Sequence, residues 1–424
     1  MTHHPNSTHF DTHALTTGDR SDSDELRLVG VGLVTPLGFS AWDTFASLLA
    51  GRSISDRSAD EDMGPAHVHA PVDPVALVRR VGAAAQAHHT AFDPAVVLAE
   101  KAAREALGQA GSTGDQTPCF VGVSKGAVTA LDDACRSMRP AAAGDWARPL
   151  IAHAEQAVTL GPAGYLCTSL AERLRTPAIH CTIAACASGL AALHRARQHL
   201  LHHANRGDRV LVVASEASLL PQYIHSYRRL GVLAPLTAAG YHGRPLNHER
   251  QGFMLAEMAA AVVLERTACD APAKSDHLRL ADTAEASEGY DLIRSAPGMP
   301  AFRRIAERMA ARGPVTAVHP HATGTAEHDE AEVTILAACH PNAAAYAVKG
   351  AVGHGLGASG LASLVVACLC SRARRRPPMP WIDRPIDAPL NMNAQCVSLP
   401  RWNRQAIYAA GFGGAVAGAL IESI

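Results

Sequence analysis

Cys186 has the greatest potential for covalent chemistry in this sequence. It lies between a strand-like segment over 178–183 and a helical segment over 190–203, so it marks the N-terminal end of a predicted helix. Backbone N–H groups and the positive end of the helix dipole favour the reactive thiolate there, and Ala185 and Gly189 leave room for a substrate. Because free cysteines are commonly small buried core residues, the position alone leaves a structural role open.

Two histidines in Gly-containing segments are the candidate proton-transfer groups. His321 opens the segment His-Ala-Thr-Gly-Thr directly after a strand-like segment, and His354 lies in a Gly-rich turn that follows Lys349. Glycine on both sides of His354 indicates a close approach of the backbone to another group. Histidine can donate or accept a proton near neutral pH. Taken alone, each of these histidines is more often structural or solvent-exposed.

The elements that must position these residues alternate between strands and helices. The pattern predicts helices over 41–49, 94–110, 151–174, 190–203, 298–311, 327–339 and 355–371. It predicts strands from Arg27 towards a turn at Gly38, over 119–124, 178–183, 208–215, 315–318, 345–348 and 406–410, and after Gly414. Such alternation indicates a parallel or mixed sheet in an α/β fold. Both halves contain a strand, a turn with candidate residues and a helix, which suggests a pseudo-repeat.

The composition excludes several functional classes. Charged residues make up 18% of the 424-residue chain and the net charge is −1, which argues against nucleic-acid binding. The basic run over 372–376 is interpreted as a solvated helix end, with an acidic carrier-protein contact as the alternative. The ten cysteines show no CxxC spacing, so reduced thiols in a cytoplasmic protein are expected. The dispersed histidines do not form a convincing metal site.

The N-terminal segment and the apolar runs carry no targeting signal. Residues 1–26 are polar and His-rich, without the apolar core of a secretory signal, and we expect a disordered tail there. No apolar run is judged long enough for a membrane span, which needs about 20 residues. We therefore expect no membrane and no nucleic-acid partner.

Several short motifs occur in a fixed order along the chain. Ala-Cys-Ala-Ser-Gly occupies 185–189, and His-Ala-Thr-Gly-Thr followed by Asp-x-x-Glu occupies 321–332. Lys-x-x-x-Gly-His occupies 349–354, Gly-Phe-Gly-Gly occupies 411–414, and Arg-Pro with Arg-x-Gly-Phe lies within 244–253. Over residues 27–424 the chain resembles the β-ketoacyl synthases, the thiolase-fold condensing enzymes of fatty-acid and polyketide synthesis, apart from Ala322 where their histidine motif has Gly.

The resemblance implies both a fold and a nucleophile. The expected fold is a thiolase-like five-layer αβαβα arrangement with two pseudo-repeated halves, over 27–266 and 267–424. Cys186 would accept an acyl group from the phosphopantetheine thioester of an acyl carrier protein. Backbone N–H groups of Cys186 and Phe412 would form the oxyanion hole.

The resemblance also assigns roles to the second half of the chain. His321 and His354 would drive decarboxylation of malonyl-carrier protein by stabilising the enolate oxygen. Lys349, oriented by Glu332, would fix the geometry of the histidines, with a purely structural ion pair as the alternative. The residues that would bind the phosphopantetheine arm are Thr323 and Thr325, and Phe412 would also gate the acyl pocket.

Some positions near these motifs depart from the family pattern. Gly-Glu-Gly is replaced by 256–258 (Ala-Glu-Met), and Phe-Asp after Arg-Pro by Leu246 and Asn247. Further departures are Ala184, Ala415 and Val416. Because polar groups are lost while the cysteine and both histidines remain, we expect a specialised or secondary-metabolic synthase.

Two other functions on the same fold are weighed against elongation. A non-elongating acyltransferase would keep Cys186 without decarboxylating malonate, and retention of both histidines argues against it. A catalytically silent subunit, like a chain-length factor, typically loses the nucleophile. We expect a homodimer, with a heterodimer as the alternative, and no permanently bound cofactor or metal, since the phosphopantetheine arm arrives on the carrier protein.

Overall fold

The computed structural model describes residues 24–54, 92–138 and 151–424, apart from 204, 206, 238–239, 242 and 273–276. Residues 1–23 of the expected tail over 1–26 lie outside the described residues. The last three residues of this tail, Asp24 to Leu26, instead begin strand β1 (Asp24–Val34), where they pair with β7. The strand therefore starts earlier than its apolar core indicated.

The first half of the chain forms five strands of the main sheet. Its elements are β1, α1 (Ala41–Leu49), α3 (Pro94–Ala110), β2 (Cys119–Gly122), α4 (Val128–Ser137), α5 (Gln156–Leu174), β3 (Ile179–Thr182), α6 (Ser188–His203), β4 (Arg209–Glu216), α7 (Pro221–Arg229) and β7 (Met258–Ala268). The strand order is β3-β2-β4-β7-β1. Strand β2 is parallel to β3 and β4, whereas β7 is antiparallel to β4 and β1.

The second half repeats this topology. Its elements are β8 (Leu278–Ser287), α8 (Pro300–Ala310), β9 (Ala317–His319), α9 (Ala326–Cys339), β10 (Ala344–Ala345), α10 (Val348–Val352), α11 (Ser359–Ala373), β13 (Arg404–Ala410) and β14 (Ala415–Ser423). The order β10-β9-β13-β14-β8 has the same parallel and antiparallel relations. The pseudo-repeat is therefore present in the structure, while the boundary at 266/267 stays a prediction.

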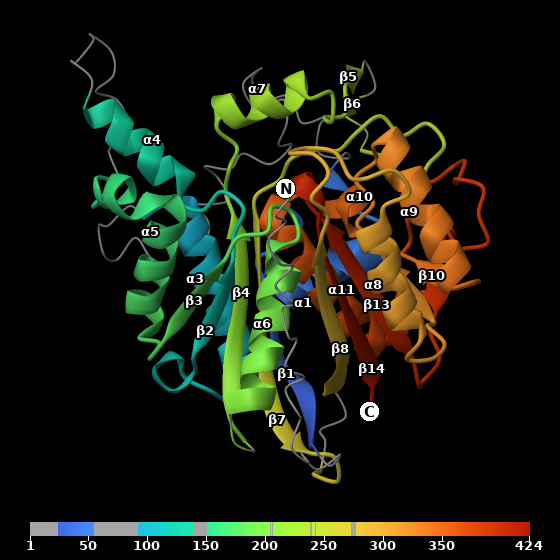
Figure 1. Cartoon of the computed structure of the whole chain (residues 1–424), viewed down its shortest axis with the longest axis horizontal. Coiled ribbons are helices and arrows are strands. Elements are labelled where there is room, and N and C mark those ends of the chain that lie inside the picture. The colour runs from blue at the N-terminus through green and yellow to red at the C-terminus, as the bar shows by residue number, and fades with distance from the viewer. Residues whose placement is uncertain are drawn as a thin grey trace, which may run out of the picture.

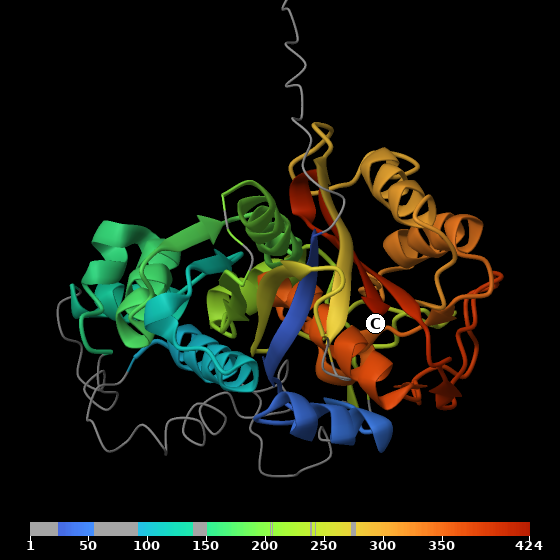
Figure 2. The same cartoon turned by 90° about the horizontal axis from the view of Figure 1, so that it is seen from below.

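The two halves enclose a central layer of helices. Helix α6 contacts strands of both halves, and α11 contacts β7, β13, β14 and α6. Helices α3 and α5 cover the outer side of the first half, and α8 and α9 cover the outer side of the second (Figures 1 and 2). This arrangement corresponds to the expected five layers. The two half-sheets are joined into one ten-stranded sheet by the short β1–β8 pairing at Arg27 and Leu28.

Small residues let the central helices approach the sheets closely. A Cβ added to Gly360 of α11 would lie 3.0 Å from the Ala409 Cβ of β13 and 3.0 Å from the Leu190 Cγ of α6. A Cβ on Gly189 would lie 2.9 Å from Leu361. The Ala- and Gly-rich composition thus serves the central layer, where larger side chains would overpack the core.

Three predictions about the second half need correction. The strand expected over 345–348 is only two residues long, because Val348 already begins α10. The basic run is not uniformly solvated, since Arg376 is fully buried and donates to the carbonyls of Asn393 and Gln395. The stretch Leu356–Ala373 is long and apolar enough to cross a membrane, but 89% of it is buried inside the protein, as a central-layer helix requires.

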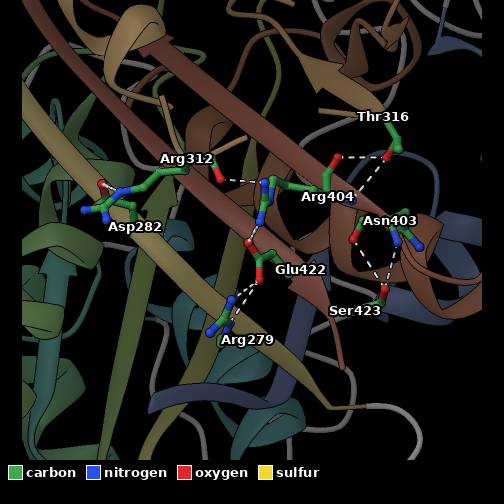
Figure 3. Close-up of polar contacts among 8 residues, drawn as sticks. All are labelled: Arg279, Asp282, Arg312, Thr316, Asn403, Arg404, Glu422 and Ser423. Carbon is green, nitrogen blue, oxygen red and sulfur yellow. Dashed lines mark hydrogen bonds and ion pairs between the residues drawn. The ribbon is translucent and has the colours of Figure 1, made fainter. Parts of the chain in front are cut away.

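Two small sheets, each made of two-residue strands, and an ion-pair network complete the fold. The pairs are β5 (Leu236–Thr237) with β6 (Gly240–Tyr241) and β11 (Arg375–Arg376) with β12 (Val397–Ser398). At the end of the β8–β14 ladder away from Phe412, two buried carboxylates pair with arginines (Figure 3). The residues of this arginine network are Asp282 with Arg308, Arg312 and, at 3.8 Å, Arg197 of α6, and Glu422 with Arg279 and Arg404.

Candidate active site

The turn between β3 and α6 presents Cys186. Ala185 has a φ of 47°, a left-handed conformation that is strained for a residue with a side chain and is typical of functional turns. The Ser188 hydroxyl accepts the N–H of Ala184 at 2.9 Å and lies 2.8 Å from the carbonyl oxygen of Val123. This hydroxyl ties the turn to the sheet and holds Cys186 at the start of the helix.

Burial determines the protonation state of Cys186. Its side chain is buried, and burial raises the pKa of the thiol to about 12, with Glu216 acting in the same direction and Lys349 in the opposite one. Desolvation therefore acts against the thiolate that the helix N-terminus and the nearby positive charge favour. A neutral thiol must lose its proton as it reacts.

His321 follows β9 and is held through its backbone. Its N–H donates to Glu332 Oε1 at 2.5 Å, and the N–H of Ala322 donates to Glu332 Oε2 at 2.7 Å. Lys349 donates to the carbonyl of His321 and places its Nζ 3.5 Å from the ring Nδ1. Burial, and then the charge of Lys349, lower the pKa of His321 well below its ordinary value, so the imidazole is neutral.

His354 lies in the turn between α10 and α11. Its Nδ1 is 2.8 Å from the hydroxyl oxygen of Ser359, and the ring of Phe253 packs edge-on at 4.8 Å between ring centroids. The Ser359 contact leaves Nε2 for a ligand. Burial lowers the pKa of His354 well below its ordinary value, so this imidazole is neutral too.

One cavity of about 610 Å³ brings the reactive side chains together. Cys186, His321 and His354 all line it, and the two histidine rings lie 5.6 Å apart between centroids. The predicted residues Thr323, Thr325 and Phe412 line the same cavity. A nucleophile and two neutral imidazoles therefore line one partly open cavity.

Lys349 and Glu332 lie behind His321 and do not line the cavity. Among the ion pairs of the described residues, none joins these two side chains within 4.0 Å, although the charge of Glu332 raises the pKa of Lys349 against the effect of burial, so the orientation of Lys349 by Glu332 stays a prediction. The Glu332 oxygens instead accept backbone N–H groups. Burial raises the pKa of Glu332 and lowers that of Lys349. Glu332 thus binds the backbone N–H of His321, and Lys349 binds its carbonyl oxygen.

The segment 411–414 supplies a second wall of the cavity. A Cβ on Gly411 would lie 2.9 Å from the Cys186 nitrogen, so only glycine permits this approach. The ring of Phe412 stacks on Tyr227 at 6.3 Å. In the described part of the chain, the N–H groups of Cys186 and Phe412 have no hydrogen-bond acceptor. Both donors are therefore available to an oxygen atom in the cavity.

A buried carboxylate holds the loop that carries the two threonines. Asp329 accepts the N–H groups of Thr323 and Gly324 at 2.9 and 3.0 Å, and that of Leu246 at 3.0 Å. The hydroxyl oxygens of Thr323 and Thr325 lie 3.0 Å apart. The Asp of the Asp-x-x-Glu motif thus shapes the loop beside the cavity.

Two residues of the site were missed by sequence analysis. Glu216, the last residue of β4, is fully buried and accepts the N–H groups of Ser124 and Lys125 next to the nucleophile turn. A charged residue that ends an apolar strand is a signal that could have identified it. His328, on α9, lines the cavity, and its i,i+4 spacing to Glu332 is the corresponding signal.

Two of the departures from the family pattern, Ala256 and Met258, lie beside the turn that carries His354. Met258 is fully buried and fills the space above Gly355, where an added Cβ would lie 2.3 Å from the Met258 Cγ. The N–H of Ala256 donates to the carbonyl of His354 at 3.1 Å. Met258 thereby supports the histidine turn by packing.

Comparisons with known proteins agree with this geometry. The model of the β-ketoacyl synthase N-terminal domain matches residues 24–269, and that of the C-terminal domain matches 283–382. The 3-oxoacyl-[acyl-carrier-protein] synthase 2 of Mycobacterium leprae is 28% identical over 207 residues, which cover 46% of this chain and 49% of the relative. The highly reducing polyketide synthase ausV of Aspergillus calidoustus is 29% identical, over 57% of this chain and 10% of the relative. The matches thus span half or less of these relatives.

Solved ketosynthases share the fold at low sequence identity. The oxazolomycin ketosynthase domain OzmH KS7 of Streptomyces albus JA3453 superposes with a TM-score of 0.71 at 18% identity, over 95% of this chain and 75% of that one. A type II polyketide ketosynthase in the AntDE:AntF complex has a TM-score of 0.72 at 19% identity, over 95% and 100%. The chain belongs to the β-ketoacyl synthase family.

Proposed function

We propose that this protein condenses an acyl thioester with malonyl-carrier protein in a decarboxylative Claisen reaction. The observation that carries the proposal is the shared cavity, in which Cys186 faces two neutral imidazoles and two unpaired backbone N–H groups. Each of these groups matches one requirement of the reaction. The printed names of the relatives refer to fatty-acid and polyketide synthesis.

In the first half-reaction, Cys186 takes the acyl group from the phosphopantetheine thioester of a carrier protein. The sulfur forms a bond to the acyl carbon, the bond to the phosphopantetheine sulfur breaks, and the thiol proton passes to the departing thiolate. Because the pKa of Cys186 is raised to about 12, proton loss accompanies bond formation. The N–H groups of Cys186 and Phe412 stabilise the negative oxygen of the intermediate.

In the second half-reaction, His321 and His354 bind the thioester oxygen of the malonyl unit. The bond to the carboxylate breaks, CO₂ leaves, and the electron pair passes into an enolate that the two imidazole N–H groups stabilise. The enolate carbon then attacks the Cys186 thioester and releases the β-ketoacyl product, and the Cys186 thiolate takes up one proton from solvent. Lys349 positions His321 and keeps it neutral.

The carrier protein supplies the only prosthetic group that the reaction needs. Its phosphopantetheine arm would enter beside Thr323 and Thr325, whose hydroxyls border the cavity, and Phe412 would gate the acyl pocket. The AntDE:AntF structure contains a carrier protein bound to its ketosynthase, which supports such a partner. A reducing cytoplasm is the proposed compartment, since all ten cysteines are free.

A homodimer through the edge strand β3 is part of the proposal. Among the residues that the structure describes, strand β3 pairs with β2 alone, His180 and Cys181 are exposed, and Ile183 is 65% exposed. An unpaired strand edge is a template for pairing with another chain. A sister subunit in the same position would give a heterodimer.

The test follows acyl- and malonyl-carrier proteins with the purified protein by intact-protein mass spectrometry, beside Cys186→Ala. Acylation of Cys186, loss of CO₂ and a β-ketoacyl product are expected, and the accepted acyl lengths would show whether the synthase is specialised, as the departures at Met258, Ala415 and Val416 predict. Acylation with intact malonate would identify an acyltransferase instead. If no tested carrier gives acylation of Cys186 or loss of CO₂, the protein would be identified as a silent subunit.

A further inference from the structure

A third histidine, His328, faces the cavity but has no role in the proposed reaction. It lies in the first turn of α9 and lines the same cavity as Cys186, His321 and His354. Its side chain is 20% exposed, whereas His321 and His354 are buried. A polar ring at this place needs an explanation, because a hydrophobic side chain would line the wall at lower desolvation cost.

The three imidazoles form a row with His321 in the middle. The His328 ring lies 5.1 Å from the His321 ring at 76°, and the His321 ring lies 5.6 Å from the His354 ring at 81°. Edge-to-face contacts of this kind are favourable between aromatic rings. With Lys349 at 3.5 Å from Nδ1, the ring of His321 has three neighbours that oppose its rotation.

Glu332 connects His328 to the backbone of His321. The Nε2 atom of His328 is 3.7 Å from Glu332 Oε2, and this nitrogen is buried without a hydrogen-bond partner. The other oxygen of Glu332 accepts the N–H of His321. Burial, and then the charge of Lys349, lower the pKa of His328 to about 4, so a neutral ring contacts His321. One carboxylate therefore lies beside both the main chain of His321 and the side chain that packs against it.

We propose that His328 is a positioning residue that holds the His321 ring in the orientation needed for decarboxylation of the malonyl donor. This inference rests on the proposed function. During decarboxylation the electron pair of the breaking bond passes into the enolate and no proton is transferred, so catalysis depends on where the His321 N–H points. Acylation of Cys186 uses the N–H groups of Cys186 and Phe412 instead. Loss of His328 should therefore affect only one half-reaction.

The experiment compares wild-type protein with His328→Ala, His328→Phe and the control Thr334→Ala, which removes an exposed side chain on the same helix. Acylation of the cysteine from acyl-carrier protein and CO₂ release from malonyl-carrier protein are measured separately, with thermal unfolding to verify the fold. His328→Ala should slow CO₂ release by about 10- to 100-fold and leave acylation within about twofold of wild type. His328→Phe, which keeps a ring against His321, should restore most of the CO₂ release.

Three outcomes would overturn the inference while the proposed function stands. They are unchanged CO₂ release in His328→Ala, an equal loss in both half-reactions in a folded variant, and a Phe variant as slow as the Ala variant. A wild-type protein that is acylated but releases no CO₂ would instead contradict the proposed function, and this inference with it. The two failures are therefore distinguishable.

Discussion

The candidate active site and the arginine network both bury carboxylates, but in opposite electrostatic surroundings. In the arginine network, burial acts to raise the pKa of Asp282, yet the hydrogen bonds and charges of Arg308 and of Arg312 outweigh it and lower the pKa; Figure 3 shows the Arg312 contact. In the site, Glu216 and Glu332 accept mainly backbone N–H groups, and burial raises the pKa of both. The arginine network therefore stabilises the charged form of its carboxyl group, whereas burial in the site disfavours the charged form of Glu216 and Glu332.

This difference suits the two regions to different tasks. Arg308 and Arg312 are about half exposed, so water shares the cost of their charges and the network can join elements of the second half. In the cavity, the same desolvation that disfavours charge keeps His321 and His354 neutral and Cys186 protonated. Hydrogen-bond donors in a low-dielectric site stabilise a developing negative oxygen more strongly than they would in water.

The largest difference between the two regions should appear when one carboxylate is removed from each, Glu332 from the site and Asp282 from the arginine network. Glu332→Ala leaves two backbone N–H groups and the buried Lys349 without compensation, so we expect an unfolding free energy lower by about 3–5 kcal/mol. Condensation should fall by about 100-fold. Asp282→Ala should cost less, about 1–3 kcal/mol, since Arg308 and Arg312 can turn to water while the mostly buried Arg197 loses one charge partner. Chemical denaturation and carrier-protein assays measure both.

The control for this contrast is the activity of the Asp282 variant. Because Asp282 does not line the cavity, condensation should stay within about twofold of wild type. A loss as large as that of Glu332→Ala would show that the network acts on the cavity and would contradict the separation of the two regions.

The packing support behind His354 should give the next largest effect. Gly355→Ala places a Cβ 2.3 Å from Met258 Cγ, and we expect a loss of about 1–3 kcal/mol from overpacking. In the Met258→Ala background the same substitution should cost less than about 1 kcal/mol. A double-mutant cycle by urea denaturation measures the coupling. Equal costs in both backgrounds would show that Met258 does not limit the space at this turn.

The two regions should also respond oppositely to pH. Glu216 has its pKa raised from 4.5 to about 7, so its stabilising contribution is complete below pH 4.5 and is lost as the pH rises through 7. Asp282 has a lowered pKa, so its contribution is present above the ordinary value of 3.8 and is lost as the pH falls below it. Glu216→Gln should therefore flatten the stability profile between pH 4.5 and 7, by about 3 kcal/mol.

Stability curves of wild-type, Glu216→Gln and Asp282→Asn protein against pH would measure these effects. The Asp282 variant should differ in its pH dependence only on the acid side. Identical profiles for wild-type and Glu216→Gln protein would mean that the carboxyl group is not desolvated as described.

An exposed ion pair should give the smallest effect. Arg195 lies 3.3 Å from Glu285, and its side chain is 56% exposed. Arg195→Ala should change the unfolding free energy by less than about 1 kcal/mol and leave condensation unaffected. A larger change in thermal unfolding would show that this pair stabilises the fold more than an exposed ion pair should.

The sequence by itself determined the local elements and the identity of the reactive groups. The helices over 41–49 and 94–110 begin and end where predicted, because apolar periodicity and, for α3, Pro94, the Asp93 cap and Gly111 are local signals. Cys186, His321 and His354 were identified because each lies in a motif of small residues with a fixed spacing. The family resemblance ordered these motifs into one site.

Only the tertiary structure decided which groups meet and how they are charged. The nucleophile segment suggested a thiolate, but burial among residues from distant segments makes Cys186 a neutral thiol. Glu332 was expected to orient Lys349, and the structure adds that both side chains bind the main chain of His321. His328 enters the cavity because α9 turns it towards His321. Desolvation and contacts between distant segments depend on the packed fold, so no local pattern in the sequence can specify them.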